Sequence, residues 1–130
     1  MLSRRDFGRG MATGVGAVAV LPATATPAPA PVMSLYVLYP SHEGARFDIG
    51  YYRATHIPLA MKVMGATGVT LIEGVPMGSA AAPYAMIAHF RFASPEALQT
   101  ALANPAMAEV RADVARFTDI RPTVMLGKSL

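Results

Sequence analysis

The 130-residue chain contains no cysteine, and only 15% of its residues are charged. Without cysteine it has no disulfide, no thiolate nucleophile and no cysteine-ligated metal site. The net charge of +3 owes much to the N-terminus, because Arg4, Arg5, Arg9 and Asp6 all lie in the first ten residues. Residues 26–130 keep eight Lys or Arg against seven Asp or Glu, with no basic stripe that aromatic residues interrupt. We therefore expect no nucleic-acid partner.

What the chain does have is apolar residues, which make up 53% of it. That share, with so little charge, suits a compact core and argues against disorder. The length leaves room for one domain.

The first 32 residues have the order of an export signal. Residues 3–7, SRRDF, resemble the S-R-R-x-F pattern of twin-arginine signals, and a Gly- and Ala-rich apolar run follows at residues 10–21. This run is shorter than the roughly 20 residues that a membrane-spanning helix needs. Ala23-Thr24-Ala25 fits the small-x-small cleavage rule.

We therefore expect a signal peptide at residues 1–25, a stiff Pro/Ala linker at residues 26–32 and a folded domain at residues 33–128. The implied location is periplasmic or secreted, with no stable membrane insertion after cleavage. A disordered, slightly basic tail and an uncleaved anchor are the alternatives.

Within the domain, four segments have the composition of strands: residues 33–40, 67–76, 84–92 and 120–126. Residues 84–92, YAMIAHFRF, alternate with a period of two. Pro76 and Pro122 place the second and fourth strands at sheet edges, because proline cannot donate to a neighbouring strand.

Helices are expected between these strands. Asp48 is a suitable N-cap for a helix that ends near Gly65. Ser94-Pro95 begins a second helix that runs to about Ala103. A third helix follows Asn104-Pro105 and carries an apolar stripe at Met107, Val110, Val114 and Phe117. The order strand, helix, strand, strand, helix, strand predicts an α+β fold of the ferredoxin-like βαββαβ type with a four-stranded antiparallel sheet.

Proline at position 58 interrupts the pattern of the first helix. It lacks the N–H group, crowds the carbonyl of Ala54 and disfavours helical angles at Ile57. We expect about two turns of helix, a kink near residues 56–58 and a second helical piece to about Met64.

The candidate site lies at this expected kink. His56 follows Tyr52 by four residues and shares its helix face. An imidazole exchanges protons near pH 7, so His56 is the candidate catalytic residue, and Tyr52 a candidate for substrate binding. The alternatives are that His56 caps the interrupted helix or binds a metal or haem. Tyr36 and Tyr39 are further substrate-binding candidates, but they fall on opposite faces of their strand, so only one of them can face a given pocket.

We expect no cofactor and no metal, since the sequence has no Rossmann fingerprint, no phosphate-binding loop and no metal-ligand spacing among its histidines.

The segment from Leu35 to Gly65, LYVLYPSHEGARFDIGYYRATHIPLAMKVMG, resembles the start of the EthD family, named for ethyl tert-butyl ether degradation. The parts that carry the resemblance are Leu38-Tyr39-Pro40, Phe47-Asp48, Tyr51-Tyr52 and residues 55–59, THIPL. It covers about residues 33–128, and beyond its first third the match is mainly one of layout.

The resemblance implies a dimeric α+β barrel, in which two ferredoxin-like sheets close against each other, and a role in modifying small organic molecules. Members are often labelled reductases, and proteins with the same barrel include cofactor-independent monooxygenases. The resemblance therefore implies a homodimer and an enzyme, by the family's label an oxidoreductase, that acts on a small aromatic or cyclic compound. The alternative is a non-catalytic periplasmic binder of small hydrophobic molecules, or an accessory to a redox system.

Overall fold

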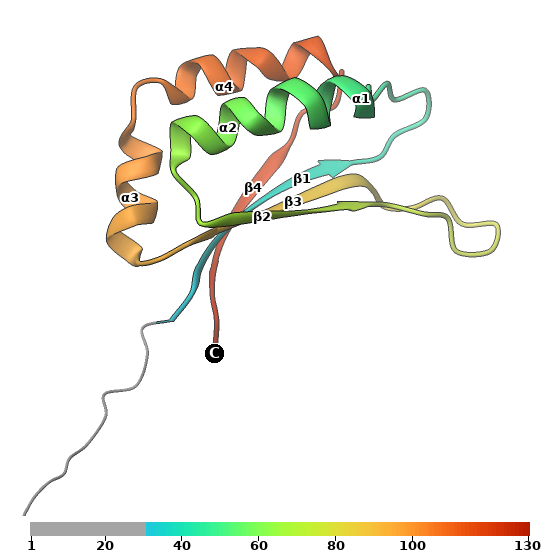
Figure 1. Ribbon diagram of the computed structural model, residues 1–130. Helices are drawn as coiled ribbons and strands as arrows, with labels where there is room; N and C mark the ends of the chain where they lie inside the picture. Colours follow the sequence, from blue (N-terminus) through green and yellow to red (C-terminus); the bar gives the residue numbers. More distant parts are fainter. Residues whose placement is uncertain (1–30) are drawn as a thin grey trace, which may run out of the picture.

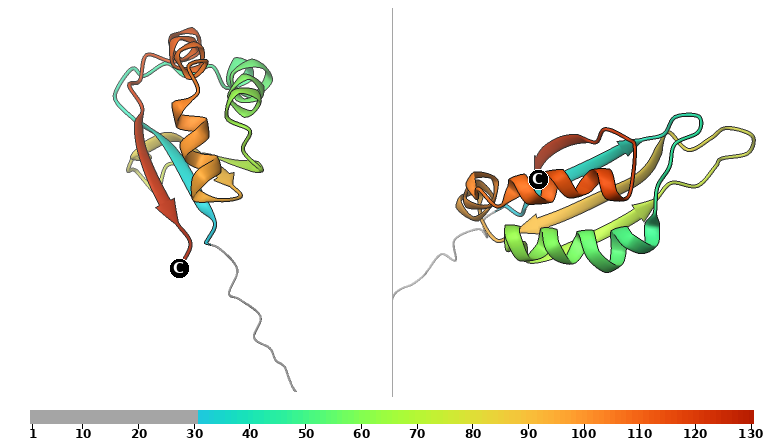
Figure 2. Two further views of the ribbon diagram at one scale, coloured as in Figure 1. Left: turned by 90° about the vertical axis from the view of Figure 1, so that its left-hand side faces the viewer. Right: turned by 90° about the horizontal axis from the view of Figure 1, so that it is seen from above.

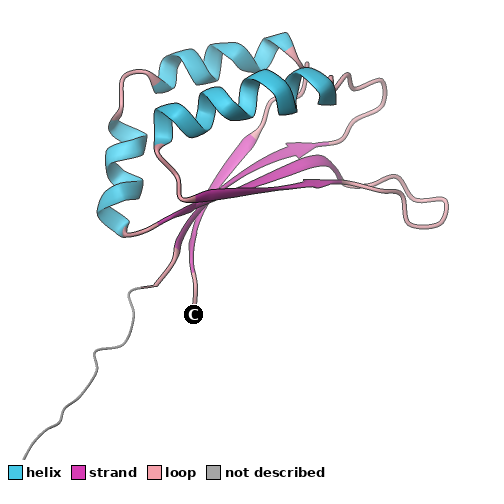
Figure 3. Cartoon of the chain, viewed as in Figure 1, coloured by secondary structure: helices cyan, strands magenta, loops and turns pink. Residues whose placement is uncertain are grey.

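Four strands form one antiparallel sheet in the order β2-β3-β1-β4 in the computed structural model, which describes residues 31–130. The strands are β1 (Met33–Pro40), β2 (Gly68–Glu73), β3 (Tyr84–Phe92) and β4 (Thr123–Lys128). The helices lie together on one side of this sheet (Figures 1 and 3). The predicted α+β, ferredoxin-like arrangement is confirmed. The predicted signal peptide lies outside the described residues, as does all of the linker except its last two residues.

The helical segments are α1 (Ile49–Tyr51), η1 (Tyr52–His56), α2 (Ile57–Met64), α3 (Pro95–Ala103), α4 (Met107–Asp113) and the 3-10 turn η2 (Val114–Arg116). None of the helices within residues 31–130 is long and apolar enough to cross a bilayer.

The second and fourth strands lie at the sheet edges, as Pro76 and Pro122 predicted, but their ends differ from the prediction. β2 ends at Glu73 rather than at Pro76, and β4 begins at Thr123, after Pro122, and continues to Lys128. Pro122 lacks the N–H group that would extend the ladder, so pairing with β1 starts one residue later.

The predicted alternation along β3 agrees with the burial of its residues, since every second side chain from Met86 to Phe92 is buried. Met86, Ala88, Phe90 and Phe92 are buried beneath the helices. On the opposite face of the sheet, Ile87 pairs with Ile72 of β2, and Tyr36 of β1 pairs with Met125 of β4. This face carries no helix within residues 31–130 (Figures 1 and 2).

The first helix is continuous, so the predicted break at Pro58 is wrong. Ile57 has helical angles, φ −65° and ψ −43°, and its N–H bonds to the carbonyl of Tyr52, five residues back. Residues 52–56 thus form a π-helical turn, one residue wider than an α-helical turn, and this insertion accommodates the proline within the helix. The ends are as predicted: the Asp48 carboxylate accepts from the Tyr51 N–H at 3.0 Å, and Gly65 ends the helix with φ 66°.

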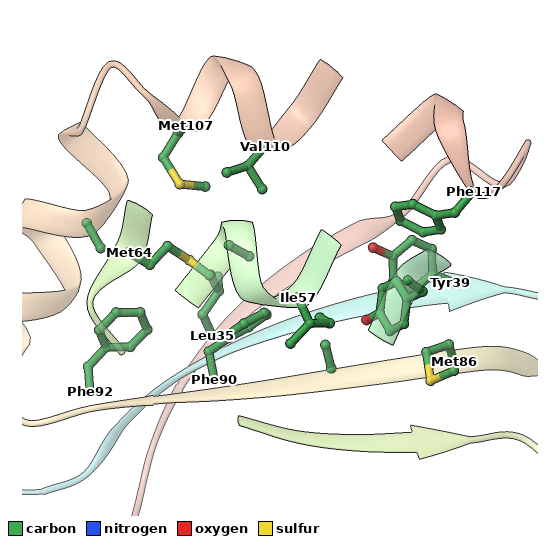
Figure 4. Packing of buried hydrophobic residues seen from close by; sticks show 14 of the residues in the cluster. Leu35, Tyr39, Ile57, Met64, Met86, Phe90, Phe92, Met107, Val110 and Phe117 are labelled. Carbon is green, nitrogen blue, oxygen red and sulfur yellow. The ribbon is translucent and has the colours of Figure 1, made fainter. Parts of the chain in front are cut away.

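The core fills the space between helices and sheet. Figure 4 shows Met107 and Val110 of α4 pointing down towards Leu35 and Phe90 of the sheet. The described helices cover only one face of the sheet, and the candidate site lies between these two layers.

Candidate functional site

A cavity of about 250 Å³ lies between the helices and the inner face of the sheet. Its wall is almost entirely apolar, and its polar members come from three places: Tyr39 on β1, Tyr52 and His56 on η1, and Arg111 on α4. Among the apolar residues of the wall, Val124 is 61% and Leu102 is 41% exposed. The cavity therefore opens to solvent beside β4, the edge strand that stands apart from the helices in the left view of Figure 2.

Three of the four predicted site residues meet at this cavity. Tyr39, Tyr52 and His56 are all buried, and the rings of Tyr52 and His56 stack with centroids 5.7 Å apart. Tyr36 is not among them. It lies on the open face of the sheet and stacks on His89 at 4.4 Å. The alternation along β1 puts the two tyrosines on opposite faces, and the structure turns Tyr39 inward.

His56 is held by an aspartate from a distant helix. Its Nδ1 lies 2.9 Å from Oδ2 of Asp113, the last residue of α4. The other carboxylate oxygen, Oδ1, accepts a hydrogen bond from the Tyr51 hydroxyl at 2.8 Å and lies 3.6 Å from Nε of Arg116. The Asp113 side chain is therefore fixed from three sides, and it fixes the plane of the imidazole in turn.

The charges of this pair follow from its surroundings. Burial opposes ionisation of Asp113, but hydrogen bonds from His56 and Tyr51 and the nearby positive charge of Arg116 outweigh it and hold the pKa of the carboxyl below its usual range. Burial lowers the pKa of His56, although the bond to Asp113 partly opposes this. At neutral pH the aspartate is thus ionised and the histidine neutral.

An ionised carboxylate can only accept hydrogen bonds, so the proton of the neutral imidazole lies on Nδ1. The lone pair is then on Nε2, which has no hydrogen-bond partner among residues 31–130. A neutral imidazole fixed in this tautomer can accept a proton from a molecule in the cavity.

The Tyr52 hydroxyl is a second polar group in the wall of the cavity. Tyr52 is fully buried, and its hydroxyl has no hydrogen-bond partner within the described residues. Tyr39 lies edge-on to it, 5.8 Å between ring centroids, close enough to perturb its pKa but without hydrogen-bond geometry. Burial raises the pKa of both phenols, so both keep their protons at neutral pH. Tyr52 is therefore a protonated phenol in the cavity wall, and no described residue uses its O–H as a hydrogen-bond donor.

The structure bears on one of the readings of His56 that the sequence left open, the helix cap. The side chain makes no capping bond to the helix, because its Nδ1 is taken by Asp113. No group of three potential metal-ligating side chains occurs within residues 31–130. The role of His56 in chemistry stays a prediction.

Sequence reasoning missed Asp113. One signal was available: Asp113 lies three residues after Val110 and four before Phe117, so it falls on the apolar face of its helix. A carboxylate in such a stripe needs a buried partner.

Comparison with known proteins places the fold. The EthD domain model matches residues 45–121. An EthD-like protein of known structure from Ralstonia eutropha is 28% identical, with a TM-score of 0.69 over 75% of this chain and 91% of that one. An EthD family protein from Bacillus halodurans is 21% identical, with a TM-score of 0.61 over 76% of this chain and 99% of that one.

More distant structures share only the fold. SnoaB, a cofactor-independent oxygenase from Streptomyces nogalater, is 12% identical, with a TM-score of 0.50 over 76% of this chain and 92% of that one. The comparison with curated proteins finds no match. The family model spans more than half of the sequence, and the strand order, the helices and the two EthD-type structures agree with it. The chain belongs to the EthD domain family.

Proposed function

We propose that this protein is an enzyme that binds a small aromatic or cyclic organic molecule in the cavity and moves a proton of that molecule with His56, without a bound cofactor. The observation that carries the proposal is the contact of 2.9 Å between His56 Nδ1 and Asp113 at the wall of a buried, apolar cavity. It gives a neutral base with a fixed tautomer, itself buried, at the wall of an apolar cavity.

The proposed step transfers one proton and changes no oxidation state. Nε2 of His56 takes a proton from a phenolic O–H or from a C–H next to a carbonyl, and the electron pair stays on the substrate as a phenolate or enolate. The Tyr52 hydroxyl donates to the oxygen on which this negative charge develops. Asp113 stabilises the imidazolium that forms. Where the anion is delocalised over a conjugated system or a ring, return of the proton to another of its carbons completes an isomerisation that needs no oxidant.

The cavity volume bounds the size of the substrate. A cavity of about 150 Å³ holds benzene in an engineered protein, so about 250 Å³ accommodates roughly ten non-hydrogen atoms. That corresponds to one substituted ring or two small fused rings.

The fold is compatible with such chemistry but does not decide it. SnoaB shows that this fold can host an enzyme without a cofactor. An oxidoreductase would also start well from a phenolate or enolate, since either anion is electron-rich. The proton step is therefore the part of the reaction that this site supports.

Two further proposals concern where the protein works. The twin-arginine pattern at residues 3–7 supports folded export to the periplasm, where the substrate would be met. The open face of the sheet, with Ile72 and Met125 more than half exposed, supports a homodimer in which a second copy covers this face.

Exchange of acidic protons with solvent tests the proposed step. The probe is 2-tetralone, a two-ring ketone of suitable size, dissolved in D2O with purified protein and followed by proton NMR. We expect the wild type to accelerate deuterium incorporation next to the carbonyl. His56→Asn keeps a hydrogen bond to Asp113 but cannot take up a proton near neutral pH, and it should abolish the acceleration.

His42→Asn is the matched control. His42 is half exposed, 3.7 Å from Asp119 and away from the cavity, so this variant should exchange at the wild-type rate. Exchange that is unchanged in His56→Asn would refute the proposal. Binding of 2-tetralone without any exchange would favour the non-catalytic binder instead.

A further inference from the structure

Arg111 interrupts the apolar face that α4 presents to the cavity. Met107, Val110 and Val114 line the cavity at intervals of three and four residues, and Arg111 falls in the same row, four residues after Met107. Figure 4 shows Met107 and Val110 of this row directed at the sheet. Arg111 also lines the groove that adjoins the cavity, together with Arg121. Its side chain thus stands at the passage between cavity and solvent.

The positive charge of Arg111 is not neutralised by its surroundings. It makes no hydrogen bond and no ion pair with any part of the chain that the structure describes. Arg116, by contrast, lies against Asp113, and Arg46 donates to the carbonyl of Ala115.

The carboxylate that lines the adjoining groove is already engaged. Asp119 accepts from the backbone N–H of Arg46 at 3.0 Å and lies 3.7 Å from His42. Within the described part of the chain, Arg111 is therefore the one arginine that lines both the cavity and the adjoining groove, while Arg121 and the engaged Asp119 line the groove alone.

We propose that the substrate of this site carries an anionic substituent, a carboxylate by preference, which Arg111 binds at the opening while the apolar body lies inside. The inference rests on the proposed function and deepens it. An apolar interior excludes a charged group, so a carboxylate must stay where water and a cation reach it. A guanidinium offers a planar pair of N–H donors that matches the two carboxylate oxygens. The opposite end of the molecule then presents its oxygen to Tyr52 and His56.

Three fluorescent probes separate charge from shape: 2-naphthol, 6-hydroxy-2-naphthoate and the neutral methyl ester of that acid. Each is titrated against wild type, Arg111→Gln and Arg121→Gln, which is the matched control because Arg121 lines the groove but not the cavity. Wild type should bind the carboxylate roughly three- to tenfold more tightly than the ester, the range for an ion pair at a half-open site. The preference should shrink at high salt.

In Arg111→Gln the carboxylate and the ester should bind equally, while 2-naphthol, which has no carboxylate, should lose less affinity than the carboxylate does. Arg121→Gln should keep the preference. Equal affinity for carboxylate and ester in the wild type, or an undiminished preference in Arg111→Gln, overturns the role of Arg111 and leaves the proposed function standing if 2-naphthol binds. Failure of all three probes to bind the wild type overturns both.

Discussion

Replacing Asp113 with asparagine is the sharpest single perturbation of this site. The carboxylate serves two donors, His56 Nδ1 through Oδ2 and the Tyr51 hydroxyl through Oδ1. An amide has only one acceptor oxygen, so one of the two donors loses its partner, or the imidazole changes tautomer to accept from the amide N–H. In the second case Nε2 becomes protonated and can no longer act as a base.

The expected loss of stability follows from how deeply the two side chains are buried. The side chains of Asp113 and His56 are 11% and 6% exposed, so the bonds between them are little weakened by water. A hydrogen bond to a charged group contributes about 1.5–3 kcal/mol, and loss of one from this site should lower the free energy of unfolding by about 2 kcal/mol. For a domain of about 100 residues this corresponds to a drop in Tm of roughly 8–16 °C. Exchange of 2-tetralone protons should fall at least tenfold.

The assay combines urea unfolding with long-range proton–nitrogen NMR of the His56 ring, which reports the tautomer directly. Tyr51→Phe is the control: it removes only the more exposed bond at Oδ1, so it should destabilise the fold less than Asp113→Asn does and leave the Nδ1-protonated tautomer in place. If Asp113→Asn were as stable as the wild type, with an unchanged tautomer and full exchange activity, Asp113 would not position His56 and the reasoning would fail.

Four further results are expected. The pKa of His56 is lowered from 6.5, so the unfolded chain takes up a proton that the folded chain resists; stability should fall as pH drops below about 6.5, and thermal melts of His56→Asn should lack this fall. Tyr52→Phe removes a buried hydroxyl without a partner, so denaturant unfolding should show equal or higher stability while 2-naphthol affinity decreases; a destabilised variant with full affinity would contradict this. Sedimentation equilibrium should show a dimer that Ile72→Lys, on the open sheet face, weakens; a wild-type monomer at micromolar concentration would contradict the dimer. Replacing both Arg4 and Arg5 with lysine should block periplasmic export, and unchanged export in cell fractionation would count against the twin-arginine route.

The fold could be predicted from local signals because most of them agree with one another. The alternation along residues 84–92 predicts which of its side chains are buried. Asp48 and Ser94 each accept a hydrogen bond from a backbone N–H three residues later, so these caps can be predicted from local sequence. The π turn at residues 52–56 could not be predicted, since Pro58 is compatible with either a kink or an inserted residue. Which of the two forms depends on how the helix packs over the sheet.

Only the Tyr52–His56 pair of the candidate site could be predicted from the sequence. Tyr52 and His56 share a face through local spacing, which the sequence contains. The bond from His56 to Asp113 spans 57 residues and exists only because α4 packs beside α2, the helix that continues from η1. Likewise, strand alternation separates Tyr36 from Tyr39, but only the side on which the helices pack determines that Tyr39 faces the cavity.

A crystal structure of the protein with 2-naphthol directly tests whether a small aromatic molecule binds in the cavity lined by His56. We expect the two rings inside the cavity among Leu35, Ala60 and Phe90, with the naphthol oxygen at hydrogen-bond distance from the Tyr52 hydroxyl or from Nε2 of His56. Naphthol bound on the open face of the sheet beside Tyr36, with the cavity lined by His56 unoccupied, would contradict it.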